Sequence, residues 1–168
     1  MNYINTKTSN TVLQKTLKRK ILFSGIGVHS GRAVSMSIEP ASCDTGIVFE
    51  RTDLENKNII KAVIDNVVES RLCTKIKNSS GIFVATIEHL MAAFSALGID
   101  NAIIKINSSE LPALDGSSNE YVKKILNAGI NTLNKRKKIF KILKEVKVKN
   151  GDRFISISPS NNLSINIS

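Results

Sequence analysis

The fold class is decided where the hydrophobic period changes, in the stretch Ala85-Thr86-Ile87-Glu88-His89-Leu90-Met91-Ala92-Ala93-Phe94-Ser95-Ala96-Leu97-Gly98. Apolar side chains recur here at spacings of three and four, which is the period of one face of an α-helix. Thr86 can cap the start of such a helix, and Gly98 stands where a left-handed residue commonly ends one. We predict a helix over residues 87–97, with a core face made of Ile87, Leu90, Met91, Phe94 and Leu97.

Strands are predicted on both sides of this helix, because apolar and polar residues there alternate with a period of two or form short apolar runs. These runs cover residues 17–23, 33–39, 46–51, 59–64, 72–76, 82–84 and 102–106. A second helix is predicted over residues 118–127, before Gly129, with its inward side chains being Tyr121, Val122, Ile125 and Leu126. Strands followed by helices predict an α+β fold, a two-layer domain of mostly antiparallel sheet with helices on one face.

The chain is expected to hold one domain and the opening of another. Residues 1–14 are polar and lack sustained periodicity, which predicts a loose leader. Residues 15–133 form the first α+β domain, and residues 134–138 form a basic linker. Residues 139–168 carry three further strand patterns, at 139–148, 154–157 and 163–167. Because strands without covering helices are rarely stable alone, we expect residues 139–168 to open an incomplete second domain of like topology.

Composition restricts the class of protein. The chain has 168 residues with 42% hydrophobic composition, which is enough to bury a core without disulfides or metals. No apolar run approaches about 18 residues, so no membrane span is expected. Two cysteines, Cys43 and Cys73, and no signal-like start predict a soluble protein of a reducing compartment, hence a cytoplasmic location.

The net charge of +10 is concentrated in one segment. Residues 135–149 hold eight of the 24 basic residues and a single acid, Glu145. Proteins that bind single-stranded nucleic acid interleave such charge with several aromatic residues, whereas Phe140 is the only one here. We therefore expect no nucleic-acid partner. Two interpretations stay open, a solvated basic segment and an anion-binding surface running from Lys135 to Lys149.

Two histidines are available for catalysis, His29 and His89. His89 follows Glu88 in the first turn of the predicted helix. An acid beside a metal-binding histidine is chemically useful, because a metal lowers the pKa of a water molecule and the carboxylate can take its proton. A Glu-His pair at a helix start is also a common structural feature, so the pair alone leaves both interpretations open.

Two other candidate residues have structural as well as functional interpretations. His29 lies in a glycine-spaced turn, where it can bond the backbone, contact an anionic ligand or be solvated. Cys73 lies in a predicted apolar strand, which favours a small core residue over a nucleophile.

Six motifs stand in one order between residue 15 and about residue 130. They are Leu17-Lys18-Arg19 through Ser24-Gly25-Ile26-Gly27-Val28-His29-Ser30-Gly31, Gly46-Ile47-Val48-Phe49-Glu50-Arg51-Thr52-Asp53-Leu54, Arg71-Leu72-Cys73-Thr74, Thr86-Ile87-Glu88-His89-Leu90, Leu97-Gly98-Ile99-Asp100-Asn101 and Glu110-Leu111-Pro112-Ala113-Leu114-Asp115-Gly116-Ser117. Together they closely resemble the UDP-3-O-acyl-N-acetylglucosamine deacetylase family, the zinc amidase of lipid A biosynthesis.

The resemblance implies a fold, a reaction and a set of site residues. The fold is two α+β domains of like topology whose helices meet and enclose the active site. His89 would be a Zn ligand and Glu88 the general base acting on the zinc-bound water. Leu72 and Cys73 would lie beside the site, and Asp115 and His29 also match family motif positions. The implied reaction is hydrolysis of the 2-acetamido group of UDP-3-O-acyl-N-acetylglucosamine, which releases acetate and a free amine.

The remaining family motifs are not found in residues 139–168. They comprise a His and an Asp of a His-Lys-x-x-Asp zinc motif, a second-domain histidine that acts as general acid, and the insert that forms the acyl-chain passage. We therefore expect this chain alone to be catalytically incomplete. A complementary second domain, or self-association through uncovered strands, is the expected partner. The alternative is a non-enzymatic, truncated remnant or binding module that keeps the fold without turnover.

Overall fold

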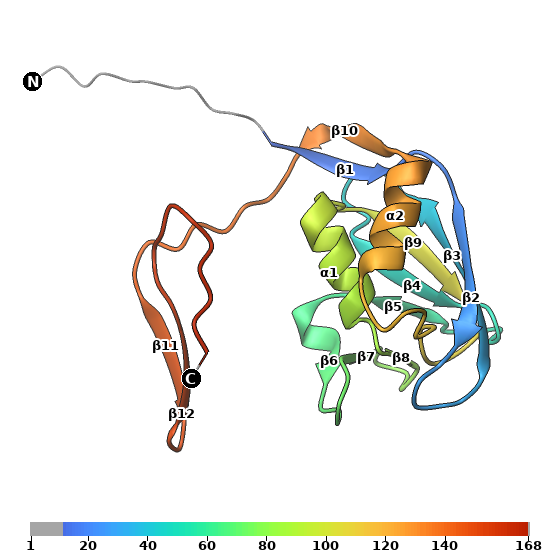
Figure 1. Cartoon of the computed structure of the whole chain (residues 1–168), viewed down its shortest axis with the longest axis horizontal. Helices are drawn as coiled ribbons and strands as arrows, with labels where there is room; N and C mark the ends of the chain where they lie inside the picture. The colour runs from blue at the N-terminus through green and yellow to red at the C-terminus, as the bar shows by residue number, and fades with distance from the viewer. Residues whose placement is uncertain (1–11, 168) are drawn as a thin grey trace, which may run out of the picture. The chain divides into compact units, whose positions relative to one another are not determined.

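The computed structural model describes residues 12–167, and Figure 1 shows its elements in chain order. The chain divides into two compact units, Met1–Lys137 (the first unit) and Lys138–Ser168 (the second unit).

The first unit is built on a mixed five-stranded sheet in the order β2-β3-β9-β4-β5. Its strands are β2 (Ile21–Ile26), β3 (Ala33–Pro40), β4 (Ile47–Arg51), β5 (Ile59–Lys61) and β9 (Ala102–Ile106). Neighbouring strands are antiparallel except for the parallel pair β4 and β9. The alternation along β3 places Val34, Met36 and Ile38 in the core. The prediction of a mostly antiparallel sheet is therefore confirmed.

Two helices cover one face of this sheet, α1 (Glu88–Leu97) and α2 (Asn119–Ala128), as Figure 1 shows. The core between the layers includes Leu90 and Phe94 of α1, Tyr121 and Ile125 of α2, and Ile104 of β9, all almost fully buried. This arrangement confirms the predicted two-layer α+β fold.

Only the C-terminal end of α1 is capped as the sequence predicts. Gly98 is the C-cap, with a left-handed φ of 71°. At the other end the helix begins at Glu88, its N-cap is Ile87, and no side chain caps it. The predicted cap at Thr86 is therefore wrong. Thr86 has a left-handed φ of 60°, and its hydroxyl donates to the carboxylate of Glu110 instead.

The core face of α2 is narrower than predicted. Tyr121 and Ile125 are buried and Val122 is half-buried, but 56% of Leu126 is exposed. Successive helical residues are about 100° apart, so burial of Ile125 turns its neighbour away from the sheet. The prediction that Leu126 faces inward is wrong.

A second, two-stranded sheet of the first unit lies outside the predicted elements. It pairs β1 (Leu13–Leu17) with β10 (Ile130–Arg136) in antiparallel register. Residues 13–14 of the predicted leader and residues 134–136 of the predicted linker therefore belong to strands, while residues 1–11 of the leader lie outside the described residues. The strands were missed because β10 is mostly polar and exposed and so lacks an apolar alternation.

A three-stranded sheet precedes α1. It is formed by β6 (Val67–Val68), β7 (Lys75–Lys77) and β8 (Phe83–Ala85), after a 3₁₀ turn η1 (Ile64–Asn66). β7 pairs with β8 in antiparallel register. The strand predicted at 59–64 ends at Lys61, and the strand predicted at 72–76 begins only at Lys75. Leu72 and Cys73 consequently lie in the bend before β7.

The second unit is a hairpin of β11 (Val146–Asn150) and β12 (Arg153–Ile157). Its register places Val146 and Val148 beside Ile157 and Ile155, so one face of the hairpin is apolar. On the other face the ammonium of Lys147 lies 3.8 Å from the ring centroid of Phe154. The strand predicted at 163–167 is not formed, and residues 139–145 are irregular.

Among the described residues, no helix is both long and apolar enough to cross a membrane.

We expect neighbouring residues of α2 to differ sharply in their effect on stability. Ile125→Ala should lower the free energy of unfolding by about 2–5 kcal/mol, because it leaves a cavity in the core. Leu126→Ala, the matched control, should change it by about 0.5 kcal/mol or less. Denaturant unfolding of both variants measures this, and equal losses would contradict the described face of the helix.

We also expect limited trypsin digestion to cut first between Lys138 and Lys144. These residues are irregular and mostly exposed, whereas Lys137 pairs with Asp100 at 2.6 Å and donates its N–H to Val12. Mass spectrometry of the first fragments tests this. An earlier cut within β10 would show that the unit boundary has been placed wrongly.

Candidate functional site

Glu88 and His89 form the first turn of α1, and both are half-buried. One carboxylate oxygen of Glu88, Oε2, accepts the backbone N–H of Thr74 at 2.9 Å. This bond fixes the direction of the carboxylate, because a backbone donor cannot swing away as a side chain can. The imidazole of His89 makes no hydrogen bond to any other described residue.

The bend at residues 71–74 lies against this helix start. Leu72 is 92% exposed and has a left-handed φ of 61°. Cys73 is half-buried, and its Sγ lies 3.0 Å from the hydroxyl of Ser70. The expectation that Cys73 sits inside an apolar strand is therefore wrong. The structure does bring Leu72 and Cys73 next to Thr74, the residue that holds Glu88.

Two residues with strained backbone lie near Glu88, one in the bend that bonds it and one just before α1. Leu72 lies two residues before Thr74, and Thr86 lies two residues before Glu88; both have left-handed φ angles. Such a conformation costs about 1–2 kcal/mol for a residue with a Cβ, so surrounding contacts must hold it. Strained backbone of this kind is concentrated at functional sites.

Glu110 is the residue of this region that sequence reasoning missed. Only 3% of it is exposed, yet its carboxylate accepts three hydrogen bonds from two distant segments. The donors are the N–H of His29 at 2.9 Å, the N–H of Ser30 at 2.8 Å and the hydroxyl of Thr86 at 3.2 Å. A glutamate that opens an otherwise apolar Leu-Pro-Ala-Leu run is a sequence signal that could have pointed to it.

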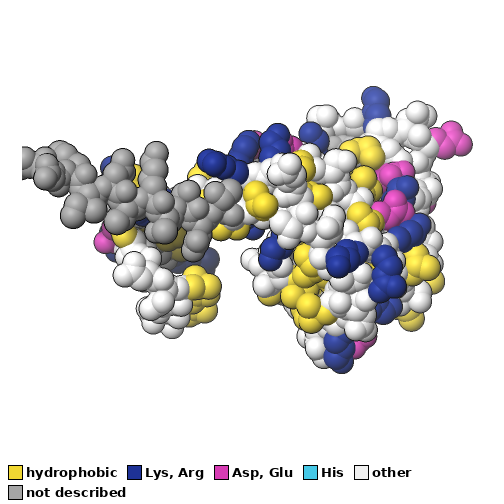
Figure 2. Space-filling model, turned by 90° about the horizontal axis from the view of Figure 1, so that it is seen from above, with side chains coloured by type: hydrophobic (Ala, Val, Ile, Leu, Met, Phe, Trp, Pro, Cys, Tyr) yellow, Lys and Arg dark blue, Asp and Glu magenta, His cyan; other side chains and the backbone are white. Residues whose placement is uncertain are grey.

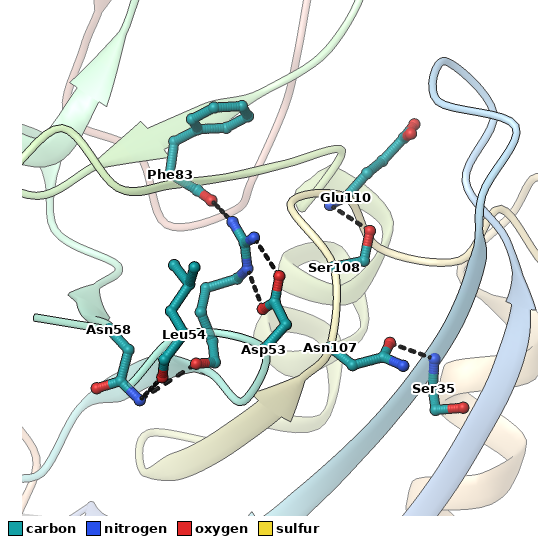
Figure 3. Close-up of polar contacts among 9 residues, drawn as sticks. Ser35, Asp53, Leu54, Asn58, Phe83, Asn107, Ser108 and Glu110 are labelled. Carbon is teal, nitrogen blue, oxygen red and sulfur yellow. Dashed lines mark hydrogen bonds and ion pairs between the residues drawn. The ribbon is translucent and has the colours of Figure 1, made fainter. Parts of the chain in front are cut away.

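The charge state of Glu110 follows from these donors. Burial acts to raise the pKa of its carboxyl, but the hydrogen bonds from His29, Ser30 and Thr86 outweigh it and lower the pKa below the ordinary value. The carboxylate is therefore ionised and charge-assisted in its bonds. Figure 3 shows the Glu110 backbone N–H bonded to the hydroxyl of Ser108, at 3.4 Å.

His29 and Asp115 lie in loops that meet β2. The side chains of both residues are exposed. Asp115 accepts the N–H and hydroxyl of Ser117, and the loop carrying it is fixed by the N–H of Ala113, which donates to the carbonyl of Ile26 at 2.9 Å. In residues 12–167, no hydrogen bond joins Asp115 to Glu88 or His89. The structure thus links His29 to the site through Glu110 and leaves Asp115 at its own turn.

A buried arginine, paired with an exposed aspartate, holds β8, the strand that leads into α1. Arg51 is 8% exposed and donates two hydrogen bonds, of 2.8 and 2.6 Å, to the carboxylate of Asp53. Its third bond reaches the carbonyl of Phe83 at 2.9 Å, and Figure 3 shows Phe83 and Asp53 bonded to the same guanidinium. The guanidinium lowers the pKa of the Asp53 carboxyl. The end of β4 is thereby tied to the start of β8.

The donor set fits only part of a zinc site. In residues 12–167 no three His, Cys, Asp or Glu side chains come together as a metal would require. A catalytic zinc site uses about three protein ligands. The imidazole of His89 suits one of these ligands, and the described part of the chain does not supply the others.

The basic residues do not gather into one anion site on the visible face of the first unit. Figure 2 shows Lys and Arg side chains at several separate places there, with acidic side chains beside some of them. Two residues of the basic segment already form ion pairs, Lys135 with Asp44 and Lys137 with Asp100. This gives no support to the anion-binding interpretation.

Comparison with known proteins gives the family of the chain. A family model described as UDP-3-O-acyl N-acetylglycosamine deacetylase matches residues 14–168. The chain belongs to this deacetylase family. The match includes the Glu88-His89 helix start, the Leu72-Cys73 bend and the loops of His29 and Glu110.

Curated relatives named UDP-3-O-acyl-N-acetylglucosamine deacetylase give the same family. The relative from Geotalea uraniireducens is 46% identical over 147 residues, which cover 88% of this chain and 48% of the relative. The one from Pseudoalteromonas atlantica is 42% identical over 148 residues, covering 88% and 49%. The one from Shewanella frigidimarina is 43% identical over 148 residues, covering 88% and 48%. The chain thus spans about half the length of these deacetylases.

We expect acid to weaken the first unit partly through Glu110. Because the folded-state pKa of this carboxyl is lowered, its contribution is present above the unfolded pKa and is lost as the pH falls through the folded pKa. The difference in unfolding free energy between wild type and Glu110→Gln should therefore narrow between about pH 6 and pH 3. Denaturant unfolding at the two pH values measures it, and a constant difference would refute the lowered pKa.

Proposed function

We propose that this chain supplies the Glu88-His89 part of the active site of a zinc-dependent deacetylase of lipid A biosynthesis. The substrate is UDP-3-O-acyl-N-acetylglucosamine, whose 2-acetamido group is hydrolysed to acetate and a free amine. The observation that carries the proposal is the oriented carboxylate of Glu88, held by the Thr74 N–H beside an imidazole that no described residue engages. The matching family model and the names of the relatives support the same reaction.

Glu88 is proposed as the general base. Its Oε2 is occupied by the Thr74 N–H, and Oε1 accepts no hydrogen bond from the other described residues. Oε1 is therefore the atom available to take a proton from a water molecule. The same carboxyl can then return that proton to the departing amine nitrogen, or a histidine from outside this chain can do so.

His89 is proposed as a zinc ligand. Zinc, when bound, lowers the pKa of a water molecule and polarises the amide carbonyl. In this proposal His89 offers a neutral imidazole nitrogen at a fixed position next to Glu88. Its half-buried position in the first turn of α1 restricts the movement of the side chain.

Four other residues are proposed to border the substrate. Leu72 and Cys73 lie in the bend that holds Glu88, and Leu72 offers an exposed apolar side chain of a kind that suits an acyl chain. His29 and Asp115 are exposed in loops beside β2. Their roles follow from the resemblance and from these positions.

The complete site is proposed to need a second part. Residues 15–133 would act as the first domain, and residues 139–168 would open a second domain. The rest of that second domain would supply the missing ligands. The apolar hairpin face of Val146, Val148, Ile155 and Ile157 supports this, because it is exposed and needs a cover. The proposal includes a cytoplasmic location. A remnant without turnover is the alternative.

We expect substitutions of Glu88 and of His89 to have different effects on the assembled enzyme. This enzyme is made from this chain and the complementary second part of a relative, supplied in trans or by fusion. Glu88→Gln should keep its zinc and lose about 10²- to 10⁴-fold in rate, because a positioned base is lost. His89→Ala should lose both zinc and rate. Zinc content by atomic spectroscopy and acetate release from the UDP-sugar measure the two effects.

Glu120→Gln serves as the matched control, since Glu120 is a solvent-accessible glutamate of α2 whose one ion-pair partner within residues 12–167 is Lys123. It should keep both zinc and rate. An active Glu88→Gln enzyme would remove Glu88 from the mechanism. A wild-type assembly that binds zinc but releases no acetate would favour the non-enzymatic alternative.

A further inference from the structure

We propose that Glu110 is a positioning residue of this site: its buried carboxylate fixes the loop of His29 against the segment that leads into Glu88 and His89. The inference rests on the proposed function, because the link matters for catalysis only if Glu88 and His89 act there. His29 and His89 are the two histidines of the chain, so Glu110 would fix the backbone of the loop that carries one against the segment that leads to the other.

Every partner of the Glu110 carboxylate is a hydrogen-bond donor. Oε1 accepts from the His29 N–H at 2.9 Å and from the Thr86 hydroxyl at 3.2 Å. Oε2 accepts from the Ser30 N–H at 2.8 Å. A carboxylate offers acceptors only, whereas a glutamine amide would turn an NH₂ group toward one of these donors. The site therefore selects a carboxylate over an uncharged side chain of the same shape.

The loop of His29 is shaped around this carboxylate. A Cβ at position 27 would lie 2.4 Å from Oε2 of Glu110 and 2.4 Å from the Ser30 hydroxyl, so Gly27 leaves the room that the contact needs. The loop is closed by two backbone bonds. The Gly27 N–H donates to Arg32 at 3.0 Å, and the Gly31 N–H donates to Gly27 at 2.9 Å. These bonds hold residues 27–32 together as one loop around the carboxylate.

Glu110 is tied equally firmly to the chain before α1. The Ala85 N–H donates to the carbonyl of Ser109 at 2.9 Å, and the Leu111 N–H donates to the carbonyl of Ala85 at 3.1 Å. Thr86 follows in its left-handed conformation, and α1 begins at Glu88. A displacement of Glu110 would therefore shift Thr86 and the helix start together with the His29 loop.

Amide hydrogen exchange of the chain, measured by NMR, tests the link directly. In Glu110→Gln the amides of His29 and Ser30 should exchange on the order of tenfold faster or more, because each loses a bond to a charged acceptor. The matched control Glu120→Gln should exchange like wild type. Unchanged exchange at His29 and Ser30 would overturn the inference, as would an equal acceleration throughout the first unit, which indicates general destabilisation.

A second variant covers the case in which Glu110→Gln does not fold. Gly27→Ala keeps the carboxylate and obstructs its contact with the loop, so the same local acceleration is expected. Wild-type exchange in Gly27→Ala would overturn the inference.

The kinetics of the assembled enzyme distinguish a positioning role of Glu110 from a role in stability alone. Glu110→Gln should lower kcat per bound zinc about tenfold or more at nearly unchanged KM and zinc content, because misplacement of about 1 Å can cost 10²-fold. An unchanged kcat per zinc would overturn the inference. A wild-type assembly without activity would overturn the proposed function and the catalytic part of this inference, while the exchange data would still report whether Glu110 fixes the loop.

Discussion

A buried carboxylate has to find donors inside the protein or be expelled to solvent, and Glu110 finds three. Two of them belong to the loop of His29 and the third is Thr86, at the entrance to α1. The His29 loop and Thr86 are more than 50 residues apart in the sequence, and both bond the same carboxylate. The Glu110 carboxylate therefore joins the His29 loop to the entrance of α1, and Gly27 leaves the room that this contact needs.

The parts of the fold that follow from local pattern could be predicted from the sequence. The helical period through Phe94, the stop at Gly98 and the alternation along β3 each describe one element by itself, and each was confirmed. What failed depends on partners elsewhere in the chain. The position of Thr86 before the helix predicts a cap, but its hydroxyl bonds the distant Glu110 instead. The sequence does not predict β10, because main-chain pairing with β1 requires no apolar alternation in a polar, exposed strand.

The site shows the same division. Glu88 and His89 could be singled out because neighbours on one helix turn are neighbours in the sequence. The sequence could draw attention to Glu110 but not assign its role, since its hydrogen-bond donors lie 80 and 24 residues before it. A zinc site is a still more distributed feature, and its ligand set cannot be completed from the residues described.

The pairing of β1 with β10 limits when β1 can fold during synthesis of the chain. Leu17 lies opposite Ile130, so the earliest described strand finds its partner more than a hundred residues later. A contact of such long sequence separation closes a large loop and is formed slowly. While the chain is being synthesised, β1 must wait, unpaired, until the ribosome has released α2 and β10. During that interval Leu17, which ends almost fully buried, is exposed to chaperones and to other nascent chains.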